Sequence, residues 1–215
     1  MSDHDGSGPD ATDGQPDDPD AYRTLGGRGR AEFTVNGSEF IGHAAPAATV
    51  DEAESFVAES REAFPDATHN VPAYRVNADP FREYSSDDGE PSGSAGKPIL
   101  NVLQGREVED AAVVVTRYYG GTNLGVGGLV RAYSRAAKEA ITDAGVTWTV
   151  PHERLVATVD YDDSGTVRGL LESADVEFEA SYEAEVRFDA RVPAREIEDL
   201  RDRLLSATSG RVELD

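Results

Sequence analysis

The strongest restriction on the fold comes from residues 151–215, where apolar and polar side chains alternate along three segments. The alternating residues are Leu155, Ala157, Val159 and Tyr161, then Val176, Phe178, Ala180 and Tyr182, then Ala184, Val186, Phe188, Ala190 and Val192. Because successive side chains of a strand point to opposite faces, this pattern predicts three half-buried antiparallel strands.

Two amphipathic helices and a short strand complete this region. Val167, Leu170, Leu171 and Ala174 recur at helical spacing after the first segment, and Ile197, Leu200 and Leu204 do so after the third. Pro193 is expected at the first position of the second helix, and "RVEL" near the end reads as a strand. The order β-α-β-β-α-β predicts a ferredoxin-like domain over residues 151–215.

Residues 22–150 are expected to form a separate α/β domain, which makes the fold class α+β. An Asn-Gly pair at 36–37 predicts a hairpin, and Thr49 and Glu52 stand at capping-box spacing before a helix. A buried strand is predicted over 113–116 and a long helix over 125–144.

Acidic residues dominate the composition. The chain has 20 Lys and Arg against 42 Asp and Glu, a net charge of −22. Residues 1–21 carry seven aspartates and no Lys or Arg, and are predicted to be a disordered acidic tail. Such a surface suits a protein that works in concentrated salt, where repulsion is screened, so we expect a halophilic protein of haloarchaeal type.

Several classes of protein are excluded at this point. The absence of cysteine rules out disulfides, thiolate catalysis and cysteine-bound zinc. The N-terminus lacks the basic and apolar regions of a secretory signal, and no apolar run is long enough to cross a membrane. A cytoplasmic location is therefore expected.

The segment "DDGEPSGSAGKP", residues 87–98, offers several kinds of chemistry. It does not match a Walker A phosphate loop, because Pro98 follows Gly96-Lys97 and Pro91 occupies the first glycine position. Its carboxylates lack the spacing of an EF-hand, so no metal site is predicted. Ser94 and Lys97 match S-x-x-K without its companion motifs. This match leaves open an enzyme that acts on a phosphorylated small molecule or peptide.

Basic residues concentrate between Lys97 and Lys138, where six stand against three acidic residues. Arg131, Arg135 and Lys138 are spaced i, i+4 and i+7, which places them on one helix face. The glycines at 125–128 serve either close backbone packing or the binding of an anion by free amides. Arginine, tyrosine and free amides together suit phosphates and unpaired bases. The alternative is a solvated helix face with ion pairs.

Two long motifs resemble the IMPACT/YigZ family. They are "DDGEPSGSAGKPILNVLQ" and "VVVTRYYGGTNLGVGGLVRAYSRAAKEAI", and "ATHNVPAYRV" lies where that family has a similar stretch. The resemblance implies an N-terminal ribosomal-protein domain 2-like α/β sandwich, as in domain IV of elongation factor G, and a ferredoxin-like domain similar to domain V of that factor. It also implies an association with the regulation of translation, but supplies no agreed catalytic residues.

We therefore expect a non-enzymatic, cytoplasmic binding protein without a cofactor, which contacts RNA or the ribosome. The candidate residues for binding nucleic acid or another anion are Glu90, Ser92, Ser94, Lys97, Arg117, Tyr118, Gly120, Gly121, Gly125, Gly127, Gly128, Arg131, Arg135 and Lys138.

Overall fold

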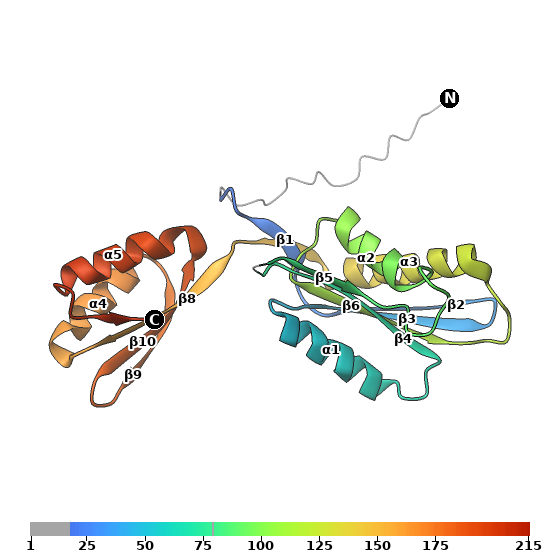
Figure 1. Ribbon diagram of the computed structural model, residues 1–215, viewed down its shortest axis with the longest axis horizontal. Coiled ribbons are helices and arrows are strands. Elements are labelled where there is room, and N and C mark those ends of the chain that lie inside the picture. The colour runs from blue at the N-terminus through green and yellow to red at the C-terminus, as the bar shows by residue number, and fades with distance from the viewer. Residues whose placement is uncertain (1–17, 79) are drawn as a thin grey trace, which may run out of the picture. The chain divides into compact units, whose positions relative to one another are not determined.

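The computed structural model describes residues 18–78 and 80–215, which form two compact units (Figure 1). One unit contains Ala21–Thr149, and the other contains Asp18–Asp20 with Val150–Asp215. Most of the acidic tail expected over residues 1–21 lies outside the described residues. None of the helices in the described ranges is long and apolar enough to cross a membrane.

The first unit is built on an antiparallel sheet with strand order β2-β3-β6-β4-β5. Its strands are β2 (Gly29–Val35), β3 (Ser38–Pro46), β4 (His69–Val76), β5 (Arg82–Ser85) and β6 (Ala111–Tyr118). Helix α1 (Val50–Ala63) covers one face, and helices α2 (Gly96–Gly105) and α3 (Gly125–Ala144) cover the other (Figure 1). Strands β1 (Tyr22–Leu25) and β7 (Val146–Thr149) form a separate antiparallel ribbon.

The central strand β6 explains why this sheet has helices on both faces. Val113 and Val115 are fully buried in the core shared with α2 and α3, whereas Ala112 and Val114 are buried in the core shared with α1. A strand that is buried on both faces must be apolar at successive positions, which accounts for the run "VVV". The predicted strand over 113–116 is thus part of a longer one.

The Asn-Gly pair and the capping box predicted in the first unit form the expected turn and helix start. Asn36 and Gly37 have φ of 48° and 83°, which matches the turn type that Asn-Gly favours in two-residue hairpins. At the start of α1, the backbone N–H of Glu52 donates to Thr49 Oγ1 at 3.1 Å, and the Glu52 carboxylate accepts from Ala48 N–H at 2.8 Å. The capping box is present, with its second bond shifted by one residue.

The second unit has the predicted ferredoxin-like order. Its elements are β8 (His152–Val159), α4 (Tyr161–Ser173), β9 (Glu177–Tyr182), β10 (Val186–Pro193), α5 (Ile197–Ala207) and β11 (Glu213–Leu214). The sheet is antiparallel with order β11-β8-β10-β9, and its apolar face packs against α4 and α5. The α+β class is confirmed.

Three details of the second unit differ from the sequence prediction. Pro193 ends β10 instead of starting a helix, and a 3-10 turn over Ala194–Glu196 precedes α5. Tyr161 begins α4, and Val176 and Ala184 lie just before β9 and β10. Each difference falls at an element boundary, where alternation and helical spacing both fade.

Candidate functional site

The loop before α2 is closed by its own carboxylate. Asp87 accepts hydrogen bonds from the backbone N–H groups of Gly93 at 2.7 Å, Ala95 at 3.0 Å and Gly96 at 2.9 Å. Burial acts to raise the pKa of Asp87, but these three donors outweigh it and hold the pKa below its usual value. These three amides are therefore occupied by Asp87 and are not available to a phosphate.

Ser94 cannot serve as a nucleophile in this structure. Its residue is fully buried, and its hydroxyl donates to the Pro91 carbonyl at 2.6 Å. Ser92 and Lys97 are exposed on either side of it. The enzyme alternative based on Ser94 and Lys97 is thus not supported, because no substrate can reach the serine. Within residues 18–78 and 80–215 there is no group of three histidines or carboxylates that can hold a metal.

Glu90 and Arg117 form a buried ion pair. Their side chains are 4% and 5% exposed, and Arg117 Nη1 lies 2.5 Å from Glu90 Oε1. The same oxygen accepts from the Tyr133 hydroxyl at 2.7 Å, and Arg117 Nη2 donates to Ser38 Oγ at 3.2 Å. Burial, followed by the bond to Glu90, raises the pKa of Tyr133. This network ties the loop, α3 and the sheet together.

Aromatic rings enclose the guanidinium of this pair. The Arg117 guanidinium lies 5.4 Å from the ring centres of both Phe40 and Tyr119. Its charge is already matched by Glu90, so it has little left to offer a polyanion. The sequence predicts that Arg117 binds an anion, whereas the structure gives it a place in the core.

A pocket of about 510 Å³ lies at the N-terminal end of α3. Its lining includes His69, Glu90, Arg117, Tyr119 and Gly125. Helix α3 begins without a side-chain cap and has no acidic residue in its first turn. The pocket therefore combines a helix N-terminus that has no side-chain cap among the described residues with a neutralised ion pair.

The glycines before and within α3 have different structural roles. Gly120 packs against the β2–β3 turn, since a Cβ on it would lie 1.9 Å from the Gly37 carbonyl carbon. A Cβ on Gly128 would lie 2.9 Å from Leu124 Cβ. Gly121 and Gly125 have φ of 84° and 67°, a conformation that suits glycine. Close packing thus explains Gly120 and Gly128, whereas only Gly125 lines the pocket.

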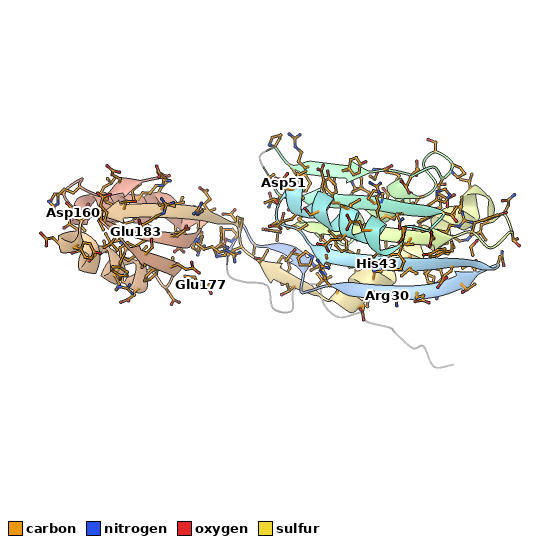
Figure 2. The ribbon with its side chains drawn as sticks, turned by 90° about the horizontal axis from the view of Figure 1, so that it is seen from below. Arg30, His43, Asp51, Asp160, Glu177 and Glu183 are labelled. Carbon is orange, nitrogen blue, oxygen red and sulfur yellow. The ribbon has the colours of Figure 1, made fainter. Side chains whose placement is uncertain are left out.

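A larger hollow of about 1150 Å³ runs along the exposed face of α3, and we call it the cationic groove. It is lined by Arg30 and Ala31 of β2, by Arg106 after α2, and by Val130, Arg131, Ser134, Arg135, Lys138, Glu139, Thr142 and Asp143 of α3. Five cations face two carboxylates here, in a chain with a net charge of −22. Figure 2 shows Arg30 on the β2 edge of the sheet.

Two of the five cations are paired. Arg135 Nε lies 2.7 Å from Glu139 Oε1, and its guanidinium lies 4.0 Å from the Phe33 ring centre. Arg30 pairs with Glu32 at 2.5 Å. Both ion pairs are about half exposed, so they are weak and salt-sensitive.

The other three cations have no acidic partner in the part of the chain that the structure describes. The side chains of Arg131 and Lys138 are exposed and make no hydrogen bond or ion pair there. Arg106 donates to Thr142 Oγ1 at 2.9 Å. Burial, and then the charge of Arg23, lowers the pKa of Arg106, but a guanidinium stays protonated at neutral pH. Three positive charges are thus available to an external anion.

The structure divides the predicted site residues into groups. Arg131, Arg135 and Lys138 lie together in the cationic groove, and Glu90, Arg117 and Gly125 line the pocket. The remaining residues line neither hollow, namely Ser92, Ser94, Lys97, Tyr118, Gly120, Gly121, Gly127 and Gly128. Sequence reasoning missed Arg30 and Arg106, which reach α3 from distant parts of the chain.

Comparison with known proteins assigns both halves of the chain. The Impact N-terminal domain matches residues 36–141, and a domain of unknown function, DUF1949, matches residues 158–211. The chain is 33% identical to the IMPACT family member YvyE of Bacillus subtilis, over 90% of each chain. It is 33% identical to the IMPACT family member YigZ of Escherichia coli, over 84% of this chain and 90% of that one.

A solved structure supports the same relationship. The crystal structure of a hypothetical protein, 30% identical, superposes with a TM-score of 0.69 and covers 91% of this chain and 96% of that one. Family motifs, fold and similarity over nearly the whole length agree, and the chain belongs to the IMPACT family.

Proposed function

We propose that this protein regulates translation by contacting RNA or the ribosome through the cationic groove, without catalysing a reaction. Two observations support the proposal. The IMPACT family, to which the chain belongs, is associated with the regulation of translation. The groove contains five cations although the chain as a whole has a net charge of −22. The single observation that carries it is the set of three cations, Arg106, Arg131 and Lys138, that lack an acidic partner among the described residues.

Electrostatic attraction determines how strongly the affinity of this contact depends on salt. Each phosphate neutralised on a duplex contributes about −0.9 to the slope of log affinity against log salt. Three contacts therefore cost about 40-fold in affinity between about 50 and 200 mM salt, and five cost about 500-fold. Binding at high salt consequently needs directed hydrogen bonds from the guanidinium groups in addition to charge.

Sedimentation with ribosomes, combined with a cell-free translation assay, tests this function. The variant Arg131→Glu with Lys138→Glu is expected to lose ribosome binding and to lose its effect on translation. The matched control, Arg82→Glu with Arg191→Glu, changes the net charge equally at exposed positions outside the groove. Equal binding by all three proteins would refute a role for the groove.

A further inference from the structure

We propose that the cationic groove recognises double-helical RNA and not single strands, an inference that rests on the proposed function. The groove combines cations on both flanks of α3 with a lining that contains no aromatic residue. Proteins bind double-helical RNA mainly through phosphates and 2′-hydroxyls along its shallow minor groove. Single strands are held by stacking of their bases on aromatic rings.

The solvent-facing aromatic residues lie away from the groove. Five are markedly exposed in the described ranges, namely Phe81, Tyr84, Tyr119, Tyr161 and Tyr182, and none of them lines it. Phe33 contacts a cation of the groove, but its ring stacks on Phe40 at 5.7 Å between ring centres. The Arg135 guanidinium also lies over Phe33, so this ring already has partners. A base cannot stack there without displacing Arg135.

Within residues 150–215, the open face of the second unit's sheet carries no phenylalanine, tyrosine or tryptophan on which a base could stack. Ferredoxin-like domains that read single-stranded RNA carry aromatic residues on this face. In this chain, the positions that alternate with the core residues of β8 and β10 are Arg154, Val156, Thr158, Arg187, Asp189 and Arg191. Arg154 and Asp189 also pair with each other across the two strands. This face is polar and partly self-neutralised.

The arrangement of cations around α3 fits two rows of phosphates. Arg30 contributes from β2 and Arg106 from the end of α2, while Arg131 and Lys138 project from α3 itself. Lys138, Ser134 and Arg106 also line a second hollow of about 350 Å³ beside α2. Both hollows contain Arg106, Ser134 and Lys138, so they adjoin on the α2 side of α3, and the cations of α3 extend along the helix for about 10 Å. Cations along α3 and on both of its flanks can meet the phosphates that border a shallow groove on both sides.

Polar groups in the two hollows suit the sugars of RNA. The Ser134 side chain lines both hollows, and Asn101 is exposed in the smaller one. Hydroxyl and amide groups can both donate to and accept from a 2′-hydroxyl, which DNA lacks.

Tyr119 provides an internal contrast. It is 46% exposed, but it lines the pocket at the N-terminal end of α3 and lies against Arg117. A single ring in that position can stack one base only, whereas binding of single strands uses successive bases. Tyr119→Ala should therefore leave the affinity for duplex RNA within about threefold of the wild-type value, because no base of a duplex stacks on this ring.

The test compares two RNAs by fluorescence anisotropy with the full chain. One is a hairpin with a long stem, and the other is an unpaired oligonucleotide of equal length. We expect the hairpin to bind at least tenfold more tightly. Replacing Arg106 and Lys138 by alanine should remove this preference, and replacing Arg82 and Arg191 should keep it. Thermal melting of each variant verifies that it is folded.

The outcomes separate the two proposals. The duplex inference would be overturned if the single strand bound as tightly as the hairpin, or more tightly, and lost this binding in the Arg106→Ala, Lys138→Ala variant. The proposed function would survive that result. A strong loss of affinity in Tyr119→Ala would also overturn the duplex inference. Failure of both RNAs and of ribosomes to bind would overturn the proposed function itself.

Discussion

Arg117 and Lys138 come from the same basic stretch of sequence, yet the structure gives them opposite situations. Arg117 is buried, bonded to Glu90 and Ser38, and lies close to two aromatic rings. Lys138 is exposed in the cationic groove and has no acidic partner in the described ranges. A cluster of basic residues therefore combines cations of two kinds, and only burial and pairing tell them apart.

The difference has an energetic reason. Moving a guanidinium out of water is costly, so a buried arginine is tolerated only with a well-placed carboxylate and further hydrogen bonds. An exposed cation has no such cost and keeps its charge for a partner. We therefore assign Glu90 and Arg117 to the stability of the first unit, and the groove cations to binding.

The largest expected effect is on stability at the buried pair. Glu90→Ala should reduce the free energy of unfolding by about 3–5 kcal/mol, because it leaves Arg117 as a buried charge without its carboxylate. Urea denaturation measures this loss. The control is Glu139→Ala, which removes the exposed partner of Arg135 and should cost less than about 1 kcal/mol. Similar losses in the two variants would remove the distinction between the two regions.

The next effect is on binding and concerns the exposed cations. Arg131→Ala with Lys138→Ala should weaken binding of the RNA hairpin by about tenfold or more, as two phosphate contacts are lost. Isothermal titration at fixed KCl measures the affinity. The melting temperature should stay within about 2 °C of the wild-type value, since exposed substitutions change stability by about 0.5 kcal/mol at most. A large drop in melting temperature would place these residues in the fold.

A substitution at Gly120 tests the close packing of the segment before α3 against the β2–β3 turn. Gly120→Ala should destabilise the protein by about 1–3 kcal/mol, because its methyl group would overlap the Gly37 backbone. Thermal melting measures the shift. Gly27→Ala is the matched control, because no atom lies within 4 Å of its added Cβ. An undisturbed melting curve for Gly120→Ala would mean that the two glycines do not touch in solution.

The smallest effect concerns the pH dependence at Asp87. The folded pKa of Asp87 lies below its ordinary value, so its charge stabilises the fold above about pH 4. This contribution is lost as the pH falls through the lower folded pKa. Asp87→Asn should cost about 1 kcal/mol at pH 7, a typical value for a helix cap, and progressively less below pH 4. Urea denaturation at several pH values measures the difference, and a pH-independent gap would contradict a role for the charge.

The periodic parts of the fold were predictable from the sequence. Alternation along Leu155–Val159 and Val186–Val192 places one face of each strand in the core, and the stripe of Val167 and Leu171 does the same for α4. Strand β5 was missed. Its four residues are mostly exposed at the edge of the sheet and show no apolar alternation. Tertiary pairing with β4, and not local pattern, makes it a strand.

The candidate site was only partly predictable, because its decisive contacts join distant residues. Helical spacing placed Arg131, Arg135 and Lys138 on one face, but Arg30 reaches the groove from β2. Burial of Arg117 depends on Glu90, which lies 27 positions earlier. No local signal reveals such partners. The halophilic character inferred from the net charge stays a prediction.

The KCl dependence of RNA affinity tests the central claim most directly. For the wild-type protein, the plot of log affinity for the hairpin against log KCl should have a slope of about −3 to −4.5, as expected for three to five neutralised phosphates. For Arg131→Ala with Lys138→Ala, the slope should become shallower by about two. The same slope in both proteins, or a wild-type slope near zero, would contradict the view that the exposed cations of α3 meet a polyanion.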